Sequence, residues 1–215
     1  MDAINLDYWQ DELMPAITDA TWDLIKHHVR ATVIDFCTQT ELVRVRELPI
    51  NLVANQVEYE LAEVVDTYIA NNEIVRIHNV FSGKNQLQLR TIQQLLSEIG
   101  DLKQVGEPKY FNQPKADKIL VYPVPESGSF AGLIVDVILR PTRICETIDG
   151  NVAKDYFDAI AHGTKQRIHR IPNKPYSDGA ASAFFGSLYM NEVYKAKNSV
   201  DKGIGRGVLR TKAYY

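Results

Sequence analysis

A few residues in this sequence combine types and spacings that suit chemistry. Asp158 and His162 lie four residues apart in a segment with helical periodicity, and His169 follows seven residues later. Such spacings place side chains on one side of a helix, where a carboxylate and two imidazoles could bind a metal ion or a ligand. A solvated helix face explains the same pattern, because no further ligand motif accompanies it. A catalytic or ligand-binding site around Asp158 and His162 therefore stays open as the alternative reading.

Other chemical motifs are absent from the sequence. The glycine-rich run at 203–207 follows a predicted helix and lacks the Lys-Ser/Thr pair of a phosphate loop. Cys37 falls on the apolar side of a predicted helix, which indicates a small core residue. Neither cysteine belongs to a nucleophile motif, and no Gly-x-Ser-x-Gly elbow occurs. We therefore expect a protein that is not an enzyme, with no catalytic residue, cofactor or metal.

The composition limits the classes of protein to which this chain can belong. The chain has 215 residues, of which 45 % are hydrophobic, so it can bury a substantial core. Its net charge of -3 disfavours a DNA-binding regulator, because duplex binders carry concentrated basic surfaces. The sequence shows no secretory signal and no apolar run long enough to cross a membrane. We expect a soluble protein made in the cytoplasm of its host cell.

Helical periodicity governs the first 40 residues. Leu6, Trp9 and Leu13 recur at helical spacing, and Pro15 is expected to end that helix. Asp19 is predicted to cap a second helix of about five turns. The predicted apolar stripe of the second helix consists of Trp22, Ile25, Val29, Val33, Phe36 and Cys37.

From residue 43 the hydrophobic residues recur at every second position, a period that is typical of strands. Alternation predicts a half-buried strand around 57–61 and another around 75–81, with His78 facing solvent. The predicted inward residues of the second strand are Val75, Ile77 and Phe81. The strongest strand candidates span 118–122 and 133–139. The middle of the chain is therefore predicted to form a mainly antiparallel sheet.

A short helix interrupts this sheet in the sequence. Thr91 and Gln94 have the spacing of a capping box ahead of an apolar run that reaches Ile99. Gly100 is placed to end the helix.

Helical spacing returns in the last third of the chain. One helix is predicted from Val152 through Tyr156 and Ile160 to Gly163. After two prolines, Ser177 or Asp178 is expected to cap a further helix. The predicted apolar side of that helix carries Ala181, Phe184, Phe185, Leu188 and Val193.

These segments predict an α+β fold. The terminal helices, 1–42 and 150–200, are expected to form a discontinuous helical bundle. The β-rich segment 43–149 is inserted between them, and 201–215 forms a flexible C-terminal tail.

Charge is unevenly distributed between the ends of the chain. Residues 1–40 carry seven acids against two bases, a net charge of -5, whereas 201–215 carry four bases against one acid, a net charge of +3. The seven acids are Asp2, Asp7, Asp11, Glu12, Asp19, Asp23 and Asp35. Opposite charges on one chain suit head-to-tail contact between copies, although acids also favour helix starts and solvated faces.

The glycine-rich tail cannot build a core of its own, so it is either a frayed terminus or a peptide that orders on a partner. In the second case, the residues that would anchor the peptide to its partner are Arg206, Leu209, Arg210, Tyr214 and Tyr215.

The ordered set of short segments resembles the head-to-tail adaptor proteins of tailed bacteriophages, the group that includes the tail tubular protein A type of short-tailed phages. The segments that carry this resemblance are Asp-Phe-Cys at 35–37, Val-Ala-Asn-Gln-Val-Glu-Tyr-Glu-Leu at 53–61, Gly-Glu-Pro-Lys-Tyr at 106–110, Ile-Leu-Val-Tyr-Pro-Val-Pro at 119–125, Leu-Arg-Pro at 139–141 and Pro-Asn-Lys-Pro-Tyr-Ser-Asp at 172–178.

The resemblance implies a virion protein of the neck, usually assembled as a twelve-fold ring. Its expected partners are the portal protein, the tail nozzle or tail tube protein, and further copies of itself. Genomic DNA would pass through the ring without sequence-specific binding. The resemblance also implies that the helices build the ring, the sheet faces the tail and the C-terminal segment docks between portal subunits.

Overall fold

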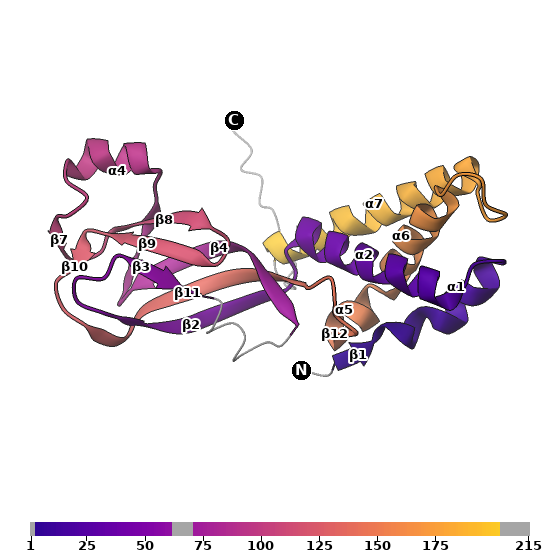
Figure 1. Cartoon of the computed structure of the whole chain (residues 1–215), viewed down its shortest axis with the longest axis horizontal. Coiled ribbons are helices and arrows are strands. Elements are labelled where there is room, and N and C mark those ends of the chain that lie inside the picture. The colour runs from indigo at the N-terminus through magenta and orange to yellow at the C-terminus, as the bar shows by residue number, and fades with distance from the viewer. Residues whose placement is uncertain (1–2, 62–70, 203–215) are drawn as a thin grey trace, which may run out of the picture. The chain divides into compact units, whose positions relative to one another are not determined.

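The computed structural model describes residues 3–61 and 71–202 (Figure 1). The chain is a mixed α+β protein with two compact units. We call Met1–Leu42 together with Cys145–Tyr215 the helical unit, and Val43–Ile144 the sheet unit.

The helical unit begins with a short strand and two helical turns. β1 (Ala3–Asn5) leads into a 3-10 helix (Leu6–Trp9) and α1 (Gln10–Ala16). The predicted core residues Leu6, Trp9 and Leu13 are buried. Pro15 does not end the helix as expected but lies inside it. Proline lacks an N–H to donate to the preceding turn, but the helix ends at the next residue, Ala16, and the Ile17 N–H closes the last turn on the Leu13 carbonyl oxygen at 3.0 Å.

The second helix, α2 (Trp22–Thr40), follows a turn that the sequence analysis placed incorrectly. Asp19 is not the N-cap, because its backbone is in the left-handed region at φ 67°, and Thr21 takes the cap position instead. Trp22 is only half-buried, and its indole N–H donates to Asp7 Oδ1 at 2.8 Å. The remaining predicted stripe is buried, as are two threonines: Ile25, Val29, Thr32, Val33, Phe36, Cys37 and Thr40.

The chain returns to the helical unit through β12 (Thr147–Asp149), which pairs antiparallel with β1. The helix predicted over 152–163 is two helices, α5 (Gly150–Asp155) and α6 (Phe157–His169). They separate at Tyr156, which has φ -123° and ψ 28° and packs its ring 5.1 Å from that of Phe36. Because the partner of Tyr156 in this contact, Phe36, lies 120 positions earlier, helical periodicity could not predict that the helix is interrupted at Tyr156.

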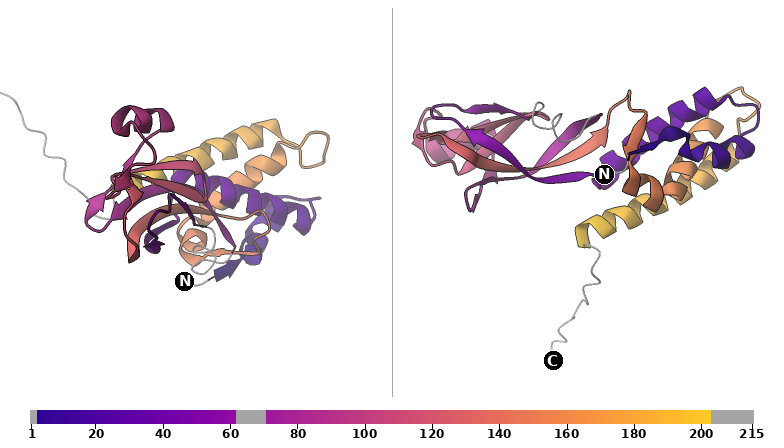
Figure 2. Two further views of the ribbon diagram at one scale, coloured as in Figure 1. Left: turned by 60° about the vertical axis from the view of Figure 1, so that its left-hand side comes forward. Right: turned by 90° about the horizontal axis from the view of Figure 1, so that it is seen from below.

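The last described helix, α7 (Gly179–Lys202), packs against α6 and α2 (Figure 2). Asp178 caps it as predicted, because its Oδ1 accepts from the Ala180 and Ala181 N–H groups at 2.9 Å. The predicted apolar face is correct in part: Val193 is buried and Ala181, Phe185 and Leu188 are half-buried, but Phe184 is 59 % exposed. The side that is buried consists of Gly186, Tyr189, Val193 and Ala196.

Gly163 in α6 lies in close contact with both α2 and α7. A Cβ atom added there would lie 2.5 Å from Thr32 Cγ2 and 2.8 Å from Tyr189 Cδ2. The glycine therefore allows α2, α6 and α7 to approach at one point, and the approach orients Tyr189 inward.

The sheet unit contains two four-stranded sheets. The first has the order β2-β11-β4-β5, with bounds Arg44–Leu52, Ser129–Pro141, Asn72–Ser82 and Asn85–Gln86. The second has the order β3-β9-β8-β6, with bounds Glu58–Glu60, Lys118–Tyr122, Tyr110–Lys115 and Gln88–Leu89. Most pairs are antiparallel as predicted, but β6 pairs with β8 in parallel, as do β7 (Val105–Gly106) and β10 (Val124–Pro125).

One core cluster takes side chains from both sheets. The four β11 residues predicted to share a face are all fully buried: Leu133, Val135, Val137 and Leu139. In β4, His78 is exposed as predicted, but Val75 and Phe81 are only half-buried. The buried residues are Ile74, Ile77 and Val80. Two register shifts in the pairing with β11 change the phase of β4, so simple alternation fails there.

The helix α4 (Ile92–Ile99), which belongs to the sheet unit, confirms the predicted capping box. The Gln94 N–H donates to Thr91 Oγ1, and Gln94 Oε1 accepts from the Thr91 N–H. Gly100, at φ 78°, follows the last turn as predicted. Leu95 is buried, whereas Leu96 is about half exposed.

Candidate functional site

The predicted docking residues, Arg206, Leu209, Arg210, Tyr214 and Tyr215, lie outside the described residues. The described part of the chain leads to them through α7. Portal docking by the tail therefore stays a prediction.

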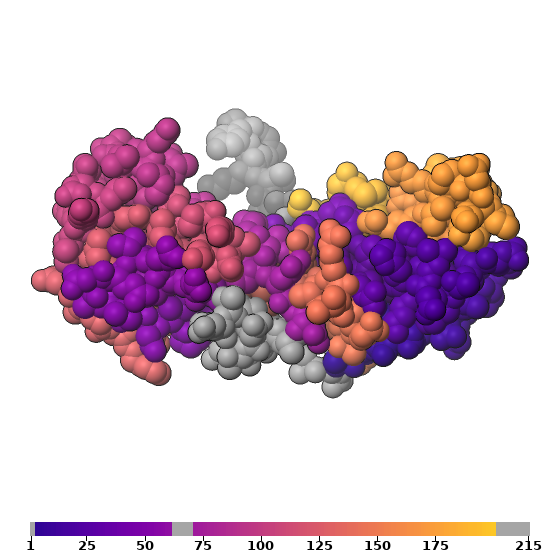
Figure 3. Space-filling model, in the orientation of Figure 1, coloured from indigo at the N-terminus to yellow at the C-terminus, as the bar shows by residue number. Residues whose placement is uncertain are grey.

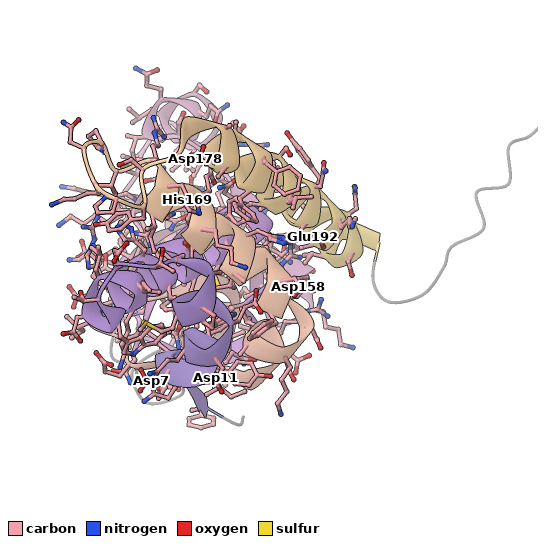
Figure 4. All side chains as sticks on the ribbon, turned by 90° about the vertical axis from the view of Figure 1, so that its right-hand side faces the viewer. Asp7, Asp11, Asp158, His169, Asp178 and Glu192 are labelled. Carbon is pink, nitrogen blue, oxygen red and sulfur yellow. The ribbon has the colours of Figure 1, made fainter. Side chains whose placement is uncertain are left out.

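The alternative site around Asp158 and His162 is described in full. Asp158 is exposed in the first turn of α6, and His169 lies in the last turn (Figure 4). His162 and His169 both stack on the Phe185 ring, each with its centroid 5.9 Å away. Seven residues of helix rise about 10.5 Å, so the phenyl ring lies between the two imidazoles. The structure thus separates His162 from His169, which spacing alone could bring together.

Hydrogen bonding and charge around Phe185 indicate a packed cluster and not a ligand set. His169 Nδ1 lies 2.8 Å from the Tyr176 carbonyl oxygen, which requires a proton on that nitrogen. Lys165 Nζ lies 5.6 Å from the Phe185 centroid and binds Glu12 Oε1 at 2.6 Å. No group of three or more His, Cys, Asp or Glu side chains within the described ranges is placed to hold a metal ion.

His162 is the least satisfied member of this cluster. Its Nδ1 atom is buried and has no hydrogen-bond partner among the described residues. Burial lowers the pKa of His162, which outweighs the opposite effect of the nearby Asp158 carboxylate. The side chain is therefore held in its neutral form at neutral pH.

A groove follows the C-terminal end of α6, the loop after it and the start of α7. It encloses about 710 Å³, and its lining includes Gln166, His169, Arg170, Asp178, Ser182 and Met190. Its serine hydroxyls bind backbone carbonyl oxygens: Ser182 donates to Gln166, Ser187 to Phe184 and Ser177 to Ile171. No described serine here bonds an imidazole, so the groove has the character of a surface recess and lacks an activated nucleophile.

The N-terminal acids are less available than their number in the sequence indicates. Asp7 binds Lys26 at 3.1 Å, Glu12 binds Lys165 at 2.6 Å, and Arg167 lies 3.2 Å from Asp35. Asp35 also accepts a 2.8 Å hydrogen bond from the Tyr189 hydroxyl and so joins α2, α6 and α7. The acids that form no ion pair with described residues are the exposed Asp11, Asp19 and Asp23.

The two cysteines are unsuited to nucleophilic chemistry. Cys37 is buried as predicted, and desolvation raises the pKa of its thiol to about 12. Cys145 is also buried, and desolvation raises the pKa of its thiol as well.

Exposed apolar side chains are the clearest candidates for partner contacts. Large exposed apolar groups cost little alone, but grouped at a surface they mark interaction sites. On α7, whose surface is visible in Figure 3, Phe184 and Tyr194 are more than half exposed. In the sheet unit, Phe130 is 89 % exposed. Phe130 was not among the residues predicted from the sequence, although an aromatic residue directly after the turn-rich stretch 123–129 is a usable signal.

Exposed apolar side chains on an α+β chain, such as Phe130 and Phe184, are typical of proteins that bind partners. The chain matches the family model of the SU10 adaptor protein over residues 2–210. It belongs to this family of phage adaptor proteins, which confirms the head-to-tail adaptor resemblance. A search of curated proteins found no match.

Family membership assigns the protein a phage adaptor role and makes it a virion component. None of the helices in 3–61 and 71–202 combines the length and hydrophobicity that a membrane crossing requires.

Proposed function

We propose that this protein forms a ring, twelve-fold by analogy with its family, between the portal and the tail nozzle of a phage. The observation that carries the proposal is the family match over residues 2–210. The ring continues the channel through which genomic DNA leaves the capsid. The helical bundle of 1–42 and 150–200 builds the ring, and the inserted segment 43–149 faces the tail.

The charge of the chain supports passage of DNA. A strongly basic channel would bind phosphates and hinder sliding. The net charge of -3, and the pairing of Lys26, Arg30 and Lys165 with acids, leave little free positive charge on this part of the helical unit.

The tail 203–215 attaches the ring to the portal. Ordering a flexible peptide costs free energy, so contacts by Leu209, the two arginines and the two terminal tyrosines must outweigh that cost. Repetition around a ring compensates for weak single contacts, because tethered tails bind with high effective concentration.

Electron microscopy and sedimentation of the chain with purified portal test this function. We expect closed rings on the portal with the full chain. A chain that ends at Lys202 retains all of α7 and should fold, but should bind the portal at least tenfold more weakly. Undiminished binding of the truncated chain would refute tail docking, and absence of any ring on the portal would refute the adaptor function proposed here.

A further inference from the structure

The sheet unit presents an aromatic side chain on a loop with a defined backbone. Between the paired positions Ser129 opposite Leu52 and Leu133 opposite Ile50, β11 has three residues and β2 only one, Asn51. This bulge removes Phe130 from the ladder and leaves its side chain 89 % exposed. We call residues 126–132 the finger loop; it lies at one end of the sheet unit (Figure 1).

Contacts next to Phe130 hold the finger loop in place. The Ala131 N–H donates to Asn51 Oδ1 at 3.0 Å, and Ala131 has a left-handed backbone at φ 48°. A Cβ atom at Gly132 would lie 2.7 Å from the Leu52 Cβ atom, so only glycine fits there. The left-handed backbone of Ala131, a residue other than glycine, costs about 1 kcal/mol or more, and such strain is typical of functional loops. Phe130 is thus presented to a partner with little entropy left to lose.

A matching recess lies on the first sheet of the same unit. It encloses about 570 Å³ and is lined by Arg46, Glu47, Phe81, Gly83, Ile134 and Asp136. Phe81 and Ile134 are directly paired across β4 and β11 and are half-buried. The residues on either side of Ile134 in β11, Leu133 and Val135, face the core, so Ile134 faces outward. The recess therefore has an apolar floor on the outer face of the sheet.

The wall of this recess is also preformed. Asp136 accepts a 3.0 Å hydrogen bond from the Glu47 N–H through Oδ1 and a 3.1 Å bond from Asn79 Nδ2 through Oδ2. Glu47 itself is in the left-handed region at φ 60°. The Asp136 carboxylate is committed to the scaffold, so the remaining charged side chains of the lining are the exposed Arg46 and Glu47, of which Arg46 is the cation.

Charge indicates which occupant fits. Arg46 is exposed and forms no ion pair with described residues, and the same holds for Glu126 at the base of the finger loop. Phe130 does not fill the recess of its own chain, because it is almost fully exposed. A second copy would supply an aromatic group for the apolar floor and a carboxylate for Arg46. Finger and recess are different surfaces, so the contact is heterologous and can repeat from copy to copy.

We propose that Phe130 of one copy inserts into the Phe81–Ile134 recess of the next copy, with Glu126 meeting Arg46. This inference rests on the proposed ring and names a contact that would link its subunits. Both surfaces belong to the sheet unit, so the contact requires no particular placement of the helical unit.

Photo-crosslinking tests the contact directly. The full chain with benzoylphenylalanine at position 130 is mixed as heavy-isotope and light-isotope copies, irradiated with and without portal, and mapped by mass spectrometry. We expect crosslinks between heavy and light copies at residues 81–83 or 134–136. Crosslinks within one copy, or to portal or another surface only, would overturn the proposal.

Substitutions provide an independent measurement. Phe130→Ser should weaken self-association about 30-fold or more in sedimentation, as expected for an aromatic anchor, whereas Ser127→Ala in the same loop should leave it unchanged. Glu126→Arg should also weaken it, and adding Arg46→Glu should restore it. If rings of the Phe130→Ser variant on the portal remain as stable as rings of the parent chain, the proposed contact is wrong and the adaptor function stands. If the parent chain itself forms no rings, the proposed adaptor function is refuted.

Discussion

Substitution of Gly163 tests the close approach of the three helices in the helical unit. Alanine there would place its Cβ atom 2.5 Å from Thr32 Cγ2 and 2.8 Å from Tyr189 Cδ2, well inside van der Waals contact. Both neighbours are buried, Thr32 fully and Tyr189 at 3 % exposure, so neither can move aside without disturbing the packing.

The expected change in the free energy of unfolding is the sum of two losses and one gain. Overpacking costs about 1–3 kcal/mol, and displacing Tyr189 weakens its bond to Asp35, which costs about 1.5 kcal/mol more. Alanine recovers about 1 kcal/mol of helix propensity. Gly163→Ala should therefore reduce the free energy of unfolding by about 1.5–3.5 kcal/mol.

Tryptophan fluorescence during urea unfolding measures this effect, because both tryptophans, Trp9 and Trp22, belong to the helical unit. Gly179→Ala is the matched control: it also lies in a helix, but a Cβ atom there meets nothing within 4 Å. We expect the control to be neutral or slightly more stable. Equal stability of the two variants would refute the close approach at Gly163.

Two further predictions concern titration and capping. Folding lowers the pKa of His162, so the unfolded chain binds the imidazole proton more tightly than the folded chain does. The free energy of unfolding should therefore fall as the pH drops below about 6.5. His162→Phe should reduce this pH dependence, measured by tryptophan-detected unfolding between pH 7 and 5. An unchanged slope would contradict the burial argument. Thr91→Ala removes the capping hydroxyl of α4 and should cost about 1 kcal/mol locally, seen as roughly fivefold faster hydrogen exchange in 95–99, whereas Thr91→Ser should retain protection. Unaltered exchange in the alanine variant would count against the capping box.

The adaptor family was identified from short segments that are individually weak, whereas the candidate contact surfaces came from the structure. Phe130 and the Phe81–Ile134 recess depend on a bulge and on strand pairing over more than 50 positions, which no local pattern encodes. The N-terminal acids show the same limit: Glu12 is neutralised by Lys165, 153 positions away.

Local interactions are what the sequence by itself determined. The capping box of α4, the Asp178 cap and the buried face of β11 depend on neighbours within a few residues or on simple alternation, so they were predicted correctly. Only the tertiary structure decided the orientation of α7, the break at Tyr156 and the phase of β4. Each of these arises where side chains distant in the sequence compete for the same space, and packing free energy then outweighs the local preference.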